Sequence, residues 1–285
     1  MADQTDAAAT RLARTAGELW VDLLVLRHLL VARLRSQLQY RASFITQIIA
    51  NAAVGLSEFG TILVFFRHVD EIGGWTIGEI AILYGIATIS FGIGHLLASG
   101  LPRFSEQLVR GEFDQVLTRP VSAFVQVMGS DLQLRRLGHV VQVGAALAIG
   151  LTLTDVPWDI VRVVALPGIM VGIVVLYTAL FALEATVSFW TTQGIEAVNI
   201  ATYGGNTIAA YPIDIFAAWL KRLFLFVVPL AFAVHIPMAW LLGKPTPLGL
   251  PGWVGFLSAP VLVLFCLAIG WLWRIGVRRY RSTGS

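Results

Sequence analysis

Charged side chains are scarce in this sequence, and residues 101–122 are the longest strongly charged interruption between its long apolar runs. Only 13% of the 285 residues are charged, whereas soluble domains carry about a quarter. The stretch lies between long apolar runs and contains Arg103, Glu106, Arg110, Glu112, Asp114 and Arg119. Charges of both signs on a short exposed segment can fix the register and orientation of a protein partner. We therefore expect this stretch to contact a separate, soluble protein.

Motifs of catalytic chemistry are missing from the sequence. Its Gly243-Lys244 pair is followed by Pro245 and is not preceded by a glycine-rich phosphate loop, so it is not a Walker A site. Neither an H-E-x-x-H metal motif nor a G-x-S-x-G nucleophile motif occurs. The single cysteine, Cys266, excludes an internal disulfide or a cysteine metal site. We predict that the chain is not an enzyme and binds no metal or cofactor.

The elements that hold the polar stretch are predicted to be membrane helices. Hydrophobic residues make up 57% of the chain, and the mean hydropathy is +0.77. Several apolar runs reach about 20 residues, the length at which a helix crosses a bilayer. The prediction is an all-α membrane protein with six transmembrane helices in one domain, residues 18–281. The spans are residues 43–66, 77–97, 137–153, 161–190, 223–242 and 253–273.

Segments outside the spans have their own predictions. Leucines at spacings of three and four, accompanied by arginines, predict an amphipathic interfacial helix over residues 18–41. Residues 1–17 are predicted to be a disordered N-terminus, and residues 282–285 a short tail. Residues 191–222 mix polar and apolar side chains and are predicted to stay at the cytoplasmic side as interfacial or cytosolic helices.

The basic residues predict which side of the membrane each loop faces. With six spans, all 20 Lys and Arg fall on the side of both termini and the polar stretch, except Arg67, Arg162 and Lys244. Cytoplasmic loops carry such an excess of basic residues. The prediction is a multi-pass protein of a bacterial inner membrane with cytoplasmic N- and C-termini. The net charge of +3 is then explained by topology and lipid head groups, and no nucleic-acid partner is expected.

Four residues inside the predicted spans are further candidates. Glu58 and Glu184 are carboxylates at membrane depth, where charge is costly. They either line a translocation path for a cationic or amphipathic substrate or hydrogen-bond a neighbouring helix, and the sequence leaves both readings open. Pro229 and Pro237 lie inside the fifth predicted span and are expected to kink it.

Three stretches of the sequence suggest a family. GEFDQVLTRPVS (residues 111–122), FWTTQGIEAVNIATYGGN (189–206) and YPIDIFAAWLKRLFLFVVPLAF (211–232) resemble a bacterial subfamily of permease subunits of type-2 ATP-binding cassette (ABC) exporters. Six spans with cytoplasmic termini and a basic helix before the first span fit the same family. The resemblance covers nearly all of residues 18–281, and the loop motif within it includes Leu117, Thr118, Arg119 and Pro120.

The resemblance implies a fold, partners and contact residues. Two permeases, identical or paralogous, would pair to form the substrate path, and a dimer of a separate ABC ATPase carrying ATP and Mg would bind below them. A coupling helix in the loop after the second span would dock on the ATPase. The residues at that contact would be Glu106, Leu108, Arg110, Gly111, Glu112, Phe113 and Asp114, with Leu108 and Phe113 as apolar anchors.

Alternatives remain at this stage. The polar stretch could be a solvated helix and loop in which Arg119 touches lipid phosphate. The chain could also be a stand-alone secondary transporter or channel, or a membrane enzyme or scaffold. The cargo suggested by mostly apolar spans is a small amphipathic or lipid-like molecule. In larger type-2 exporters the loop before the last span carries helical hairpins, whereas here residues 242–252 leave little room for an outer gate.

Overall fold

The computed structural model describes most of the chain from residue 71 onward. The described residues are 71–281 without 133–136, 155, 157, 192 and 193, together with 20–22, 24–32, 34, 35, 45, 46, 49, 50, 53 and 60. The predicted first span, the disordered N-terminus, Glu58 and the tail therefore lie largely or wholly outside the described residues.

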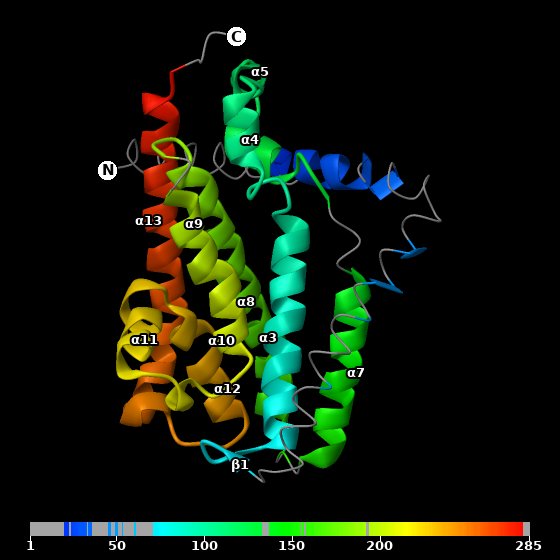
Figure 1. The fold of residues 1–285 in the computed structure, drawn as a ribbon, viewed down its shortest axis with the longest axis vertical. Helices are drawn as coiled ribbons and strands as arrows, with labels where there is room; N and C mark the ends of the chain where they lie inside the picture. The colour runs from blue at the N-terminus through cyan, green and yellow to red at the C-terminus, as the bar shows by residue number, and fades with distance from the viewer. Residues whose placement is uncertain are drawn as a thin grey trace, which may run out of the picture.

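Long helices run side by side along the long axis of the molecule (Figure 1). They are α3 (Ile77–Leu97), α7 (Leu137–Leu153), α8 (Ile160–Val187) and α13 (Ser258–Arg279). Among the described residues, three helices are long and apolar enough to cross a membrane, namely Ile77–Leu97, Ile160–Val187 and Gly252–Arg279. This agrees with an all-α membrane protein, but it leaves the predicted total of six spans open.

The central helix α3 begins at a strong local signal. A short hairpin of β1 (Glu71–Ile72) and β2 (Trp75–Thr76) precedes it. Gly73 and Gly74 form its turn with φ of 60° and 79°, values that glycine adopts without strain. Thr76 then caps the helix, since its backbone N–H donates to Glu79 Oε2 at 2.8 Å while its hydroxyl accepts from the Glu79 N–H.

Small residues bring α3 and its neighbours together. At Gly150 of α7, an added Cβ would lie 2.9 Å from the Cβ of Ala81 on α3. Close approach of this kind is how membrane helices gain packing energy, because lipid tails offer no hydrophobic advantage over leucine. Helix α3 packs against both α7 and α8, and α13 packs against α8. Asp159 caps the N-terminus of α8, because its Oδ1 accepts from the Arg162 N–H at 2.7 Å.

Residues 191–222 do not stay at one end of the bundle, so that prediction is wrong. Helix α9 (Gly194–Asn199), η2 (Ile200–Gly204) and α10 (Gly205–Ala209) follow each other without a gap. Their 16 residues extend about 24 Å at the usual helical rise. They run beside α8 from one end of the bundle to the end where β1 lies (Figure 1). The polar side chains of this segment lower its hydropathy, so it was not predicted to lie along the bundle. Some of these side chains face other helices.

The chain then turns at the β1–β2 end. Elements η3 (Ile213–Ile215) and α11 (Ala218–Arg222) lie there, as do η6 (Pro247–Gly249) and η7 (Gly252–Leu257) (Figure 1). Asp214 Oδ1 accepts from the Leu248 N–H at 3.2 Å. Lys221 donates to the Asp214 carbonyl oxygen at 3.0 Å. Lys221 and Arg222, which were assigned to the cytoplasmic side, thus lie near the opposite end from residues 101–122.

The predicted fifth span, residues 223–242, is a bent pair of helical segments. One segment comprises α11 and η4 (Leu223–Val227), and the other comprises η5 (Ala231–His235) and α12 (Ile236–Leu241). They meet at 85°. Lys221 at the start belongs to the β1–β2 end, and Lys244 after the second segment donates to the Gly74 carbonyl oxygen at 2.9 Å. The pair therefore enters and leaves the bundle at the same end, as a re-entrant segment does.

The two prolines of this segment have different positions. Pro229 lies in the break, beside Val228, whose φ and ψ of −111° and 111° are extended. Proline lacks the N–H that would continue the helix, which explains a break at this point. Pro237 lies at the junction of η5 and α12, where the helical segment continues without a break. Only Pro229 therefore lies at the 85° bend.

Candidate functional site

The polar stretch folds into two short helices joined by a tight turn. Helix α4 (Phe104–Val109) and helix α5 (Phe113–Leu117) project from the end of the bundle opposite β1 (Figure 1). Gly111 between them has φ of 70°, a conformation that disfavours other residues. The Glu112 N–H closes the turn by donating to the Gln107 carbonyl oxygen at 3.0 Å. We call residues 104–117 the elbow.

The inner side of the elbow is aromatic. Phe104 and Phe113 are completely buried, and their rings meet edge to face with centroids 5.0 Å apart. They pack on rings from two other elements, and the five residues Phe104, Phe113, Phe189, Trp273 and Tyr280 form what we call the aromatic cluster. Each such ring pair is worth about 0.5–1.5 kcal/mol beyond the area it buries. The elbow is thereby attached to α13 and to the end of α8.

The prediction that Leu108 and Phe113 anchor a partner is wrong. Phe113 is 0% exposed and Leu108 is 8% exposed, because both face the inside of this chain. Apolar and aromatic residues near glycine turns look alike in sequence whether they face a partner or their own core. The exposed apolar side chains of the elbow are Val109 and Leu117, at 68% and 43%. Nothing in the linear sequence separated these two from their buried neighbours.

The outer side of the elbow is charged. Arg110 lies 3.6 Å from Glu106 and 3.8 Å from Glu112, measured between guanidinium nitrogen and carboxylate oxygen. All three side chains are more than half exposed, so the two ion pairs contribute little to stability. They remain available to exchange partners on contact with another protein. Arg119 and Pro120 of the loop motif are exposed as well, and the Thr118 hydroxyl donates to the Gln115 carbonyl oxygen at 2.8 Å.

Asp114 lies between the two sides. It neighbours Tyr280, and burial together with the Asp114 carboxylate raises the pKa of the Tyr280 phenol. A protonated phenol next to a carboxylate is a favourable arrangement at neutral pH. Asp114 therefore belongs to the seam between the elbow and the end of α13.

Helix α6 (Ala123–Met128) fixes the elbow from below. Gln126 is buried and donates to the carbonyl oxygens of Val116 and Val121 at 3.1 and 3.0 Å. Gln107 donates to the Ser130 hydroxyl at 2.9 Å, and Arg103 pairs with Asp131 at 3.1 Å. These hydrogen bonds and the ion pair connect the elbow to α6 and to the residues that follow it.

The N-terminal helical residues meet the elbow through α6. Residues 20–22, 24–32, 34 and 35 are helical and lie across the bundle rather than along it (Figure 1). The Ser122 N–H donates to Asp22 Oδ1 at 3.4 Å. A Cβ at Gly129 would lie 3.1 Å from a Leu26 methyl and 3.0 Å from a Leu29 methyl. The apolar face of this helix therefore rests on α6.

Glu184 lies in the interior, away from the elbow. It is 4% exposed. With the amide of Asn199 oriented to satisfy both groups, its nitrogen donates to Glu184 Oε1 and Oε2 at 3.1 and 3.0 Å. Asn199 is on the neighbouring helix α9, so the structure contains the interhelical hydrogen bond of the second reading. Sequence reasoning missed Asn199, because residues 191–222 were not expected to lie against α8.

A second interior contact involves His95 and Tyr203. His95 of α3 is buried, and its Nε2 lies 3.4 Å from the Tyr203 hydroxyl of η2. The ring of Phe181 on α8 meets the His95 ring at 4.8 Å between centroids. This contact joins α3, α8 and η2 one helical turn from Glu184. Asn199 and Tyr203 are four residues apart, a helical spacing that places both on one face of residues 194–209. A search for polar residues at this spacing would have indicated that this face packs against other helices.

Comparison with known proteins gives one match. A family model described as "ABC-2 family transporter protein" matches residues 53–284. No curated protein matches this chain, and no solved structure does. The elbow, the aromatic cluster and Glu184 all fall inside the matched range.

Proposed function

The chain belongs to the ABC-2 family of transporter proteins, and we propose that it is the substrate-conducting subunit of an ATP-driven exporter, moved by a separate ATPase through the elbow. Membership makes it a membrane subunit of an ABC transporter, which works with an ABC ATPase and is not itself the catalyst. The export direction, the docking of the elbow and the pairing with a second permease, identical or paralogous, are the further steps of the proposal.

One observation carries the proposal, namely that the elbow has two unlike sides. Its outer side combines exposed Val109 and Leu117 with a cluster of charges. This is the composition of a docking surface, in which apolar side chains supply affinity and charges supply orientation. Its inner side is completely buried aromatic surface. A body that docks outside and is packed inside can transmit displacement.

The aromatic cluster offers the route for that displacement. Phe113 contacts Tyr280 at the end of α13, with centroids 5.0 Å apart. Phe104 contacts Trp273, about two turns earlier on α13, at 5.3 Å. Phe104 also contacts Phe189, which follows α8, at 5.1 Å. Close-packed interiors shift as units and do not deform continuously. A push on the elbow would therefore move α8 and α13 together.

The orientation follows from the same end of the molecule. Helix α13 ends beside the elbow (Figure 1) with Arg274, Arg278 and Arg279. An excess of arginine marks the cytoplasmic side, so we place the elbow and the C-terminus in the cytoplasm of a bacterial cell. ATP and Mg would bind to the ATPase below the elbow. The cargo in this proposal is a small amphipathic or lipid-like molecule, in keeping with the apolar helices.

Co-isolation of the ATPase tests the proposal. The double variant Val109→Asp, Leu117→Asp changes only exposed side chains of the elbow, and we expect it to reduce the amount of ABC ATPase that co-purifies from membranes by about tenfold or more. The matched control Pro245→Asp, Trp253→Asp places the same two charges on exposed residues at the β1–β2 end and should leave co-purification unchanged. Equal recovery of the ATPase with both variants would contradict the docking role.

A further inference from the structure

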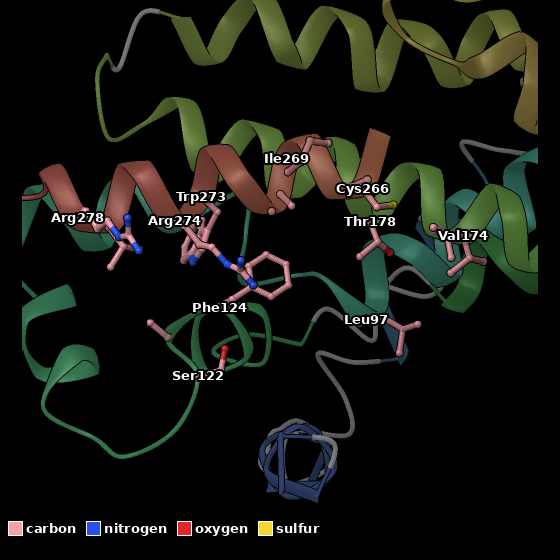
Figure 2. Close-up of a pocket in the computed structure, with 16 residues that line it drawn as sticks. Leu97, Ser122, Phe124, Val174, Thr178, Cys266, Ile269, Trp273, Arg274 and Arg278 are labelled. Carbon is pink, nitrogen blue, oxygen red and sulfur yellow. The ribbon is translucent and has the colours of Figure 1, made fainter. Parts of the chain in front are cut away.

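A groove lies on the side of the bundle, below the elbow. It has a volume of about 780 Å³ and is bounded by α6, α8 and α13 and by the end of α3. Figure 2 shows Trp273, Ile269 and Cys266 on α13 above it, and Ser122 and Phe124 at the start of α6 below it. A cavity of this size accommodates a drug-sized molecule or part of a lipid. Most of its lining is aliphatic or aromatic.

Two cations lie at one end of this groove. Arg274 and Arg278 both line it, and they are four residues apart on α13, which places them on one helix face. Neither forms a salt bridge with a carboxylate of the residues that the structure describes. The hydroxyl of Ser122 lines the same end (Figure 2). An anion is the ligand that would satisfy these groups.

The other end of the groove faces apolar helix surface. Val174, Val175 and Leu97 line it, and Val171 and Leu267 nearby on α8 and α13 are more than half exposed. Helices α8 and α13 are both candidate membrane spans, so surface of this kind is covered by lipid tails. The groove thus joins a lipid-facing apolar region to a pair of cations near the end of a span.

We propose that this groove holds an anionic phospholipid, with an acyl chain along α8 and α13 and its phosphate at Arg274 and Arg278. Basic pockets between membrane helices recognise acidic head groups in this way. A lipid seated there would contact α6, which directly follows the elbow, and α13, which carries Trp273 and Tyr280. The lipid site does not depend on docking of an ATPase.

The only cysteine of the chain provides a probe. Cys266 lines the groove and is partly exposed. The purified full-length chain is labelled with N-ethylmaleimide in detergent micelles that contain increasing phosphatidylglycerol or phosphatidylcholine. We expect phosphatidylglycerol to slow labelling, and phosphatidylcholine at the same mole fraction to slow it far less. Inorganic phosphate alone should have no effect, because the acyl chain covers Cys266.

Variants of the arginines sharpen this test. In Arg274→Gln, Arg278→Gln, the phosphatidylglycerol fraction that halves the labelling rate should rise about 25-fold, because each arginine near a lipid surface contributes a factor of about five. Arg279→Gln, Arg281→Gln is the matched control, because it removes the same two charges from residues that line a different pocket. This control should behave as the unmodified chain does.

A groove-filling variant tests the site without changing charge. An added Cβ at Gly270, which lines the groove, meets nothing within 4 Å, and the same is true at Gly168 on α8 outside it. Native mass spectrometry should show that Gly270→Leu loses the bound phosphatidylglycerol and that Gly168→Leu retains it.

Several results would overturn the lipid site. The first is equal slowing of Cys266 labelling by the two lipids. The second is unchanged slowing of that labelling in the double arginine variant. The third is that Gly270→Leu retains bound phosphatidylglycerol. Slow labelling without lipid would also overturn it. Dependence of that slow labelling on protein concentration would identify a second copy of the chain as the occupant, and independence would identify a segment of the same chain.

Discussion

The ring of Phe113 packs edge to face on Tyr280, with centroids 5.0 Å apart and planes at 83°. This contact joins the turn of the elbow to the residue that follows α13. Phe113 is far from Tyr280 in sequence, so the contact depends on the whole bundle being assembled. It makes the elbow part of the membrane domain and distinguishes it from a loop that a partner could order on binding.

Removing the Phe113 ring should detach the elbow. Phe113→Ala opens a cavity in the aromatic cluster, at a cost of about 3–5 kcal/mol in the free energy of unfolding. Limited proteolysis should then cleave within residues 104–117 faster than in the unmodified chain. The control Leu117→Ala removes an exposed side chain of the same elbow and should leave the cleavage rate unchanged. Equal protection of Phe113→Ala would contradict the buried role of the ring.

Two glycines of α13 should respond in opposite ways to alanine. A Cβ at Gly276 would collide with the ring of Phe189, whereas a Cβ at Gly270 meets nothing within 4 Å. Gly276→Ala should destabilise the protein by about 1–3 kcal/mol through overpacking. Gly270→Ala should leave stability unchanged or raise it by up to about 1 kcal/mol, because alanine favours helix.

Thermal unfolding in detergent measures this pair. The melting temperature should fall for Gly276→Ala and stay or rise for Gly270→Ala. A fall of the same size in both variants would mean that α13 does not approach Phe189 as described.

The ion pair at the opposite end should support α3. Lys244 Nζ lies 2.8 Å from Glu79 Oε2, and both side chains are largely buried. Lys244→Met leaves the Glu79 carboxylate without its cationic partner, which should lower the free energy of unfolding by about 3 kcal/mol or more. Lys221→Met is the matched control, because Lys221 lies 4.0 Å from Asp214, whose side chain is 43% exposed, and its loss should cost about 1 kcal/mol.

Denaturant titration of the two lysine variants checks this difference. Adding Glu79→Gln to Lys244→Met should restore part of the lost stability, because the isolated charge is removed. Failure of the second substitution to restore any stability would show that the carboxylate is not the source of the cost.

The corrected path of residues 191–222 predicts their accessibility. In a Cys266→Ser background, Asp214→Cys should react with a membrane-impermeant maleimide on intact cells. Glu112→Cys should react only after the cells are opened, because the elbow lies at the other end of the bundle. Labelling of both positions from the same side would contradict the placement of residues 194–209 as the segment that joins the two ends.

Local signals allowed part of the fold to be predicted from the sequence. The spans at residues 77–97 and 253–273 follow from unbroken apolar runs, and the Gly73-Gly74 turn follows from its residue types. The position of segment 194–209 along the bundle was missed, because it contains the polar residues Asn199, Thr202 and Tyr203, which lower its hydropathy. Asn199 finds its partner on α8 and Tyr203 on α3, and such partners are set by tertiary structure and not by local sequence. The Thr202 hydroxyl donates to the Val198 carbonyl oxygen of the preceding turn.

The candidate site shows the same limit. The charges of residues 101–122 identified the segment, and Gly111 marked its turn. Which apolar side chains face outward could not be read, because α4 and α5 are too short for a helical period to define a buried face. Phe104 and Phe113 turn inward because Trp273, Phe189 and Tyr280 are there to receive them. Val109 and Leu117 are left exposed.

Site-specific photocrosslinking tests the coupling claim most directly. A photoreactive phenylalanine analogue replaces Val109, Leu117 or, as a control, Trp253, which is exposed at the β1–β2 end. Cells are irradiated, the tagged chain is isolated, and attached proteins are identified by mass spectrometry. We predict adducts with an ABC ATPase at positions 109 and 117 and none at 253. Absence of an ATPase adduct at both elbow positions, or an equal adduct at 253, would contradict the account.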